Sequence, residues 1–179
     1  MALRVLWPCL LALLFTACTS TPTANMDFDS SFDFGPVKTI AIQPINRTVA
    51  STIIVSDMQV SRINEAITQE LEQRGYRMVA DNAQADLFLT WHLITQERMD
   101  VRNYNTSIRY NCWNCGGSNV RVTQFTQGTF IVDLIDPERL QSVWRSVFES
   151  RLRNQPDPAQ AEENRRAAAA AIFAGFPPN

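Results

Sequence analysis

The sequence is poor in the residue types that carry most enzymatic and metal chemistry. Its 179 residues include one histidine, His92, and only six glycines. No serine lies in a nucleophile elbow, and no glycine-rich loop follows an expected strand to hold phosphate. A zinc site needs about four ligands, usually two cysteine pairs or added histidines. The sequence therefore predicts no catalytic residue, no metal site and no cofactor.

An excess of positive charge is also absent. The chain has 16 basic and 18 acidic residues, a formal net charge of −2. Proteins that bind nucleic acid usually present a concentrated positive field to the phosphate backbone. We therefore expect no nucleic acid among its partners.

Near the N-terminus the apolar run is short. It extends from Val5 to Phe15, follows Arg4 and ends before small residues. A membrane-spanning helix needs about 20 apolar residues, whereas a secretory signal peptide has this shorter pattern. Residues 1–17 are therefore expected to be a signal peptide, and the mature chain to be exported.

The residues that end this run resemble a known processing signal. Phe15-Thr16-Ala17-Cys18 is similar to the lipobox of bacterial lipoproteins, in which cleavage leaves an N-terminal cysteine that carries lipid. The resemblance implies lipidation of Cys18 and a membrane anchor. Thr19 follows the cysteine where an aspartate would favour the inner membrane, so the outer membrane is the expected location. An ordinary secreted protein cleaved nearby is the alternative.

Residues 18–36 have no sustained hydrophobic period. They are rich in Thr, Ser, Asp and Pro, which bury too little apolar surface to fold alone. We expect the lipidated cysteine and a flexible tether here. The Asp-Phe repeats in this stretch could dock as an edge segment on the following domain.

The remaining residues, 37–179, are long enough for one domain with its own core. Ser56 and Gln59 form a capping box before an amphipathic helix, and Gly75 suits its C-terminal end. A second helix is expected from Asp157 to Gly175, with Ile172, Phe173 and Phe176 as its apolar contacts. Alternating or continuous apolar patterns predict four strands, at residues 37–45, 85–99, 126–136 and 141–152.

This element order, β-α-β-β-β-α, defines the expected fold class. A right-handed crossover would make the first two strands parallel, and the later hairpins are antiparallel. We therefore expect an α+β fold with a mixed four-stranded sheet and both helices packed on one face.

Several blocks of the sequence resemble one known family. "DFGPVKTIAI", "VSRINEAITQELEQRGY", "ADLFLTWH", "GTFIVDLID" and "AIFAGFPP" look like the bacterial lipoprotein family of domain of unknown function 4136. The similarity runs from about Phe28 to Pro178. It implies the fold and the envelope compartment. The family has no established activity, so the resemblance implies no catalytic residue.

The pair Cys112 and Cys115 lies in a turn-like stretch, "RYNCWNCGGSN". Disulfides persist in exported proteins. A disulfide between Cys112 and Cys115 would close a loop of a few residues and stabilise the folded state by only about 2 kcal/mol. The leading interpretation is thus a local staple. A redox site, a zinc site completed across a dimer, and free thiols remain alternatives. Trp113, between the cysteines, either contacts a partner or bilayer or folds back onto the sheet.

Other residues that could suggest catalysis have simpler interpretations. His92 lies within an expected strand, where a packed or edge histidine is commoner than a base. Asp133 and Asp136 are expected on opposite faces of a strand. Their carboxylates would then point away from each other and could not act together as a general acid and base.

The sequence therefore predicts a membrane-anchored envelope lipoprotein that faces the periplasm. The expected role is non-catalytic binding or scaffolding of another envelope protein or component. A carrier of an apolar ligand or lipid, held between sheet and helices, is the alternative, since the alanines of the last helix could leave room. A thiol oxidoreductase is a third possibility.

Overall fold

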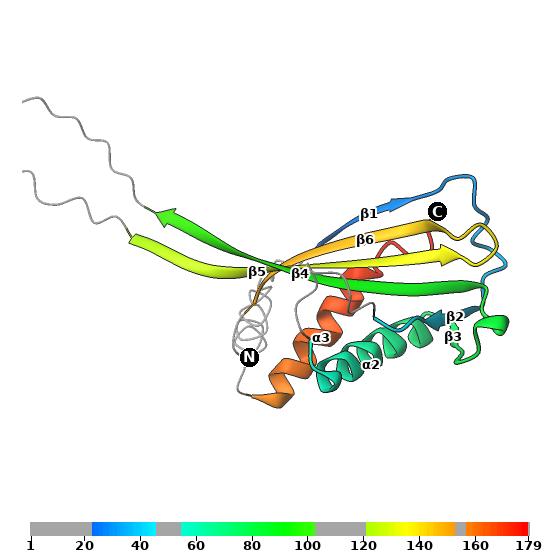
Figure 1. Cartoon of the computed structure of the whole chain (residues 1–179), viewed down its shortest axis with the longest axis horizontal. Helices are drawn as coiled ribbons and strands as arrows, with labels where there is room; N and C mark the ends of the chain where they lie inside the picture. The colour runs from blue at the N-terminus through cyan, green and yellow to red at the C-terminus, as the bar shows by residue number, and fades with distance from the viewer. Residues whose placement is uncertain (1–22, 46–54, 103–120, 153–156, 179) are drawn as a thin grey trace, which may run out of the picture.

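The computed structural model describes residues 23–45, 55–102, 121–152 and 157–178. A single mixed sheet lies on two helices, both on the same side of it (Figure 1). No helix in these ranges is long and apolar enough to cross a membrane. In chain order the elements are β1 (Ala24–Phe28), β2 (Thr39–Ile42), α2 (Asp57–Gln73), β3 (Arg77–Met78), the short 3₁₀ helix η2 (Asn82–Gln84), β4 (Leu87–Arg102), β5 (Arg121–Asp136), β6 (Gln141–Leu152) and α3 (Pro158–Ile172).

The sheet has six strands, in the order β1-β6-β5-β4-β2-β3, so the expected four-stranded sheet is wrong in strand number. The α+β class is confirmed. The parallel pairing of β2 with β4 and the antiparallel β4-β5-β6 order also agree with the prediction. The two extra strands, β1 and β3, are short and lie at the two edges of the sheet.

Strand β1 comes from the segment expected to be a tether. It pairs antiparallel with β6, from Ala24 opposite Phe148 to Phe28 opposite Trp144. Sheet structure in the described residues thus begins at Ala24 and not at residue 37. The edge-segment interpretation of the Asp-Phe repeats agrees with this pairing, which depends on backbone hydrogen bonds more than on apolar side chains.

Helix α2 forms as its sequence predicts. Ser56 accepts a hydrogen bond from the Gln59 backbone, and the Gln59 side chain accepts one from the Ser56 backbone, which completes the capping box. Ile67 and Leu71 are buried against the sheet. Gly75 then has a φ of 90°, which favours glycine, and the chain turns back into β3.

Helix α3 begins at the Asp157 cap with Pro158 in its first turn. Its end is fixed to the sheet by aromatic residues, as predicted from Phe173 and Phe176. Phe173 stacks on Trp144 with ring centroids 5.6 Å apart, and Phe176 meets the same ring edge-on at 5.2 Å. The buried Ser146 hydroxyl donates to the Ile172 carbonyl at 2.9 Å. These contacts fix the angle at which α3 leaves the sheet.

Candidate functional site

A groove of about 800 Å³ lies between α2, α3 and the helix-facing side of the sheet. Its walls are mainly apolar. Leu93, Phe130 and Phe148 line it from the sheet, and Ile63, Ala168 and Ile172 line it from the helices. This volume is within the range of about 300–1,000 Å³ that small-molecule pockets usually have.

The groove exists because α3 presents small side chains where α2 and the sheet diverge. Ala161, Ala167 and Ala168 line the α3 wall, and none of them has a side chain long enough to reach the opposite wall. Farther along α3, Ile172 and Phe173 close the space between helix and sheet. The helix is therefore packed tightly at its C-terminal end and loosely at its N-terminal end.

Charged residues border the groove, although strand alternation directs the Glu149 and Arg151 side chains to the uncovered face of the sheet. Arg151 approaches the Asp100 carboxylate at 3.4 Å and lies over the Phe125 ring, 3.9 Å from its centroid. The Glu149 carboxylate accepts a hydrogen bond from Gln127 at 2.7 Å. Arg165 of α3 is half-buried and makes no ion pair with any residue that the structure describes. Arg165 also lines a smaller polar pocket with Glu65 and Glu162, and among the described lining residues it is the cation without an ion pair at the edge of the groove.

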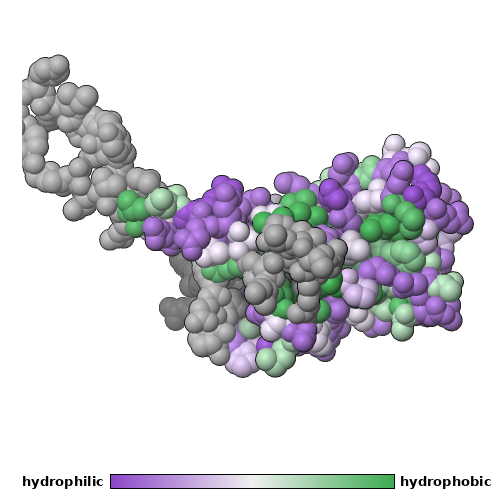
Figure 2. All heavy atoms as spheres, in the orientation of Figure 1, coloured by the Kyte–Doolittle hydropathy of each residue, from purple (hydrophilic) through white to green (hydrophobic). Residues whose placement is uncertain are grey.

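Beyond the groove, β4 and β5 project from the body as a two-stranded hairpin (Figure 1). Their pairing continues to Arg102 opposite Arg121, whereas β6 ends at Leu152, opposite Thr126. Apolar atoms are exposed near the end of this hairpin (Figure 2), where Met99 is 68% and Val122 is 52% exposed.

The structure does not describe the residues that the sequence analysis singled out as sites. Cys112, Trp113 and Cys115, and the lipidation residue Cys18, are outside the described residues, so the staple, redox and zinc interpretations stay predictions. In the described part of the chain, no group of three or more His, Cys, Asp or Glu side chains could hold a metal ion.

His92 is half-buried and lies in register with Ile131 of β5. Its neighbour Trp91 points toward the helices and donates to Asn64 of α2 at 2.8 Å, so strand alternation directs His92 to the uncovered face of the sheet. Asp133 and Asp136 bind different arginines, Arg145 and Arg139. These side chains form no acid/base pair with one another.

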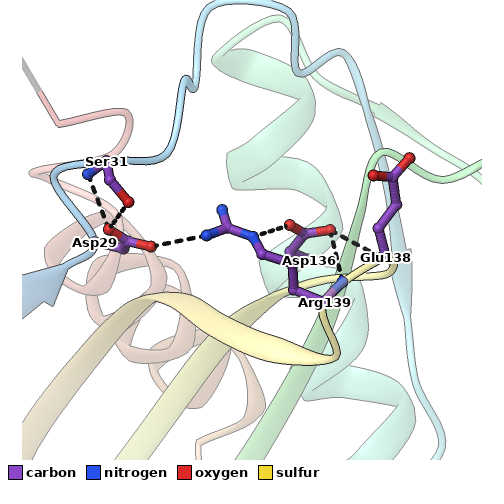
Figure 3. A network of polar contacts seen from close by, with 5 residues as sticks. All are labelled: Asp29, Ser31, Asp136, Glu138 and Arg139. Carbon is purple, nitrogen blue, oxygen red and sulfur yellow. Dashed lines mark hydrogen bonds and ion pairs between the residues drawn. The ribbon is translucent and has the colours of Figure 1, made fainter.

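The Asp136 carboxylate belongs to a polar network that ties the loop after β1 to the β5–β6 turn (Figure 3). Arg139 lies between two carboxylates, with Nε 2.6 Å from Asp136 and Nη1 3.2 Å from Asp29. Hydrogen bonds from Ser31 hold the pKa of Asp29 below its ordinary value, and the hydrogen bond from Arg139 does the same for the pKa of Asp136. Both groups therefore stabilise the fold in their charged form.

We expect this network to make the fold sensitive to acid. Groups whose pKa is lowered by folding contribute stability that is complete above the unfolded pKa, about 3.9, and lost as pH falls through the folded value. The free energy of unfolding, from urea titrations between pH 2 and 7, should be level above about pH 5 and fall below about pH 4. Arg139→Met should flatten this acid slope, while Arg62→Met, on the exposed side of α2, should not. Equal slopes in the two variants would contradict the assignment.

The structure defines the class of protein as an α+β domain with an apolar groove between its sheet and helices. The family described as "Domain of unknown function (DUF4136)" matches residues 24–178, and the chain belongs to this family. The match begins at β1, in agreement with the position of that strand in the sheet.

Solved structures that are similar to parts or most of this chain come from several bacteria. A PDZ domain protein from Parabacteroides distasonis is 18% identical with a TM-score of 0.56; the alignment covers 88% of this chain and 36% of that chain, so this protein matches about a third of it. A DUF4136 family protein from Bacteroides thetaiotaomicron is 14% identical with a TM-score of 0.47, covering 88% and 95%. The PelC dodecamer from Paraburkholderia phytofirmans is 13% identical with a TM-score of 0.44, covering 84% and 96%. Comparison with curated protein sequences gives no match.

Proposed function

We propose that this chain is a non-catalytic binding lipoprotein of the bacterial envelope, anchored through lipid on Cys18 and facing the periplasm. The observation that carries the binding role is the apolar groove between α2, α3 and the sheet. The signal-like residues 1–17 and the lipobox-like Cys18 support the anchor, and Thr19 favours the outer membrane.

The environment of the carboxylates supports a binding role over catalysis. Asp133 receives two hydrogen bonds from Arg145, and Asp136 is held by Arg139. Burial alone would raise the pKa of Asp86, but hydrogen bonds from the Thr39 hydroxyl and from the backbone N–H groups of Lys38 and Thr39 together lower it. A general base needs a pKa near the working pH, whereas the partners of Asp86 and Asp136 lower the pKa of these two carboxyls and stabilise their charged, weakly basic form.

The anchor is tested by metabolic labelling with an alkyne-tagged fatty acid. Cys18→Ser should abolish labelling and release the protein from the membrane fraction. Cys9→Ser, in the expected signal peptide, should leave labelling unchanged and serves as the matched control. Labelling that persists in Cys18→Ser, or that is absent from the unmodified chain, would refute the anchor.

A second candidate function is transport of an apolar ligand, and the groove specifically favours it. The alanines of α3 leave space that larger side chains would fill. Native mass spectrometry of the full mature chain should then show a bound lipid mass that is lost when the groove is filled. A clean protein mass under conditions that preserve known lipid complexes would count against this candidate.

A further inference from the structure

The chemistry of the groove specifies a class of ligand. Its sheet wall carries aromatic and branched side chains, among them Phe130 and Phe148, and its α3 wall carries alanines. The polar lining residues come from one stretch of each wall, Glu149–Arg151 of β6 and Asn164–Arg165 of α3, and the rest of the lining is almost entirely apolar. Such a lining favours a long, featureless hydrocarbon over a sugar or peptide, which would leave its own polar groups without partners.

Arg165 adds a polar end to this apolar channel. Arg165 is half-buried and lines the groove, and within the described residues it makes no ion pair. The nearby Arg151 and Glu149 already interact with Asp100 and Gln127. A guanidinium forms its strongest hydrogen bonds with carboxylate or phosphate oxygens, so Arg165 would favour an anionic head group.

The position of β1 relates the groove to the membrane. Ala24, the first residue of β1, pairs with Phe148, which lines the groove. Because β1 and β6 are antiparallel, the N-terminal end of β1 points along β6 toward Glu149–Leu152, which also line the groove. Cys18 lies six residues before Ala24 and is therefore at most roughly 20 Å away along an extended chain. A lipid on Cys18 would keep the groove close to the bilayer surface.

From these three observations we propose that the groove binds one long acyl chain of an anionic lipid taken from the adjacent membrane, with the lipid head group paired to Arg165. This inference rests on the proposed binding function and names its ligand class. The anchor keeps the groove near the membrane, and the apolar walls exclude water from the bound acyl chain. Arg165 favours a lipid with a negatively charged head group.

The apolar part of the proposal is tested with cis-parinaric acid, whose fluorescence rises in an apolar site. The full mature chain should bind it at one equivalent. Ala168→Phe, which fills the groove, should weaken binding at least about tenfold, a change of 1.4 kcal/mol. Ala170→Phe, on the exposed side of the same helix, is the matched control and should bind like the unmodified chain. If circular dichroism shows that Ala168→Phe does not fold, Ala161→Phe at the groove rim replaces it. Undiminished binding in a folded groove-filled variant would overturn the proposal.

The head-group contact is tested by comparing the acid with its neutral methyl ester. Arg165→Gln should weaken binding of the acid about fivefold, the effect of one partly exposed charge pair, and leave the ester within about twofold. Arg166→Gln, the adjacent residue that pairs with Glu162 and does not line the groove, should change neither affinity. Equal loss of acid and ester affinity, or no loss of either, would refute the role of Arg165.

The source of the acyl chain is tested with the lipidated chain and the Cys18→Ser chain side by side. Vesicles that contain parinaroyl phosphatidylglycerol should transfer probe lipid to both. Transfer to the Cys18→Ser chain alone would show that the protein's own acyl chain fills the groove, and would overturn the membrane source. Absence of probe binding in every chain, with labelling at Cys18 intact, would refute this inference but leave the anchored binding protein in place.

Discussion

Replacing Phe173 by alanine is expected to lower the free energy of unfolding by about 4 kcal/mol, the range for large-to-small changes at a buried aromatic residue. Phe173 is fully buried, its ring stacks on Trp144 at an interplanar angle of 8°, and it also contacts Phe176. Alanine would leave a cavity where α3 meets the sheet. It would also remove the aromatic contact that fixes the angle of the helix.

Urea unfolding followed by far-ultraviolet circular dichroism measures this loss. Phe173→Leu keeps most of the volume and should cost less than about 1.5 kcal/mol. Leu140→Ala, at a position that is 75% exposed, should change stability by less than about 0.5 kcal/mol. A loss below about 1 kcal/mol for Phe173→Ala would mean that the C-terminal end of α3 does not hold the core.

Replacing Asp133 by alanine is expected to cost about 2 kcal/mol. The Asp133 carboxylate is 8% exposed and accepts hydrogen bonds from Arg145 Nε at 2.7 Å, Arg145 Nη2 at 3.1 Å and the Ser142 hydroxyl at 2.7 Å. Hydrogen bonds to a charged group contribute about 1.5–3 kcal/mol each, but the Arg145 side chain is 54% exposed and regains water when its partner is lost. The loss is therefore smaller than for a fully buried ion pair.

A double-mutant cycle isolates the coupling between Asp133 and Arg145. Asp133→Ala, Arg145→Met and the double variant, compared by urea unfolding, should give a coupling energy of about 1 kcal/mol. Asp27→Ala is the matched control, since Asp27 is exposed and lies opposite Arg145 in register. It should change stability by less than about 0.5 kcal/mol. Equal losses for Asp27→Ala and Asp133→Ala would contradict the ranking by burial.

Local signals in the sequence were sufficient for the helices and long strands. Ser56, Gln59 and Gly75 act through hydrogen bonds and backbone angles within a few residues, so the ends of α2 were predictable. Strand β1 was harder because its outward side chains are polar and its stability depends on the backbone of β6, more than a hundred residues away. Strand β3 has two residues and no pattern at all.

The groove could be predicted only in part. The alanine run of α3 indicated room between helix and sheet, and that space is present. The bounds of β6 were predicted, but the contribution of Glu149–Leu152 was missed, because it depends on where α3 packs across the sheet. Arg165 was missed for a related reason: in the sequence it is one of several charges on a polar helix face, and only the packing of α3 brings it to the groove.

The unbroken pairing of β4 with β5 has a consequence for how many molecules the protein can engage at once. Strand β6 ends opposite Thr126 of β5, and Thr126 pairs with Glu97 of β4. The five residues from there to Arg102 extend the two-stranded hairpin by roughly 17 Å beyond the end of β6. A molecule bound at the far end of this hairpin would not contact the groove. The protein could then bind a ligand in the groove and a partner molecule at the end of the hairpin simultaneously, without steric competition between the two.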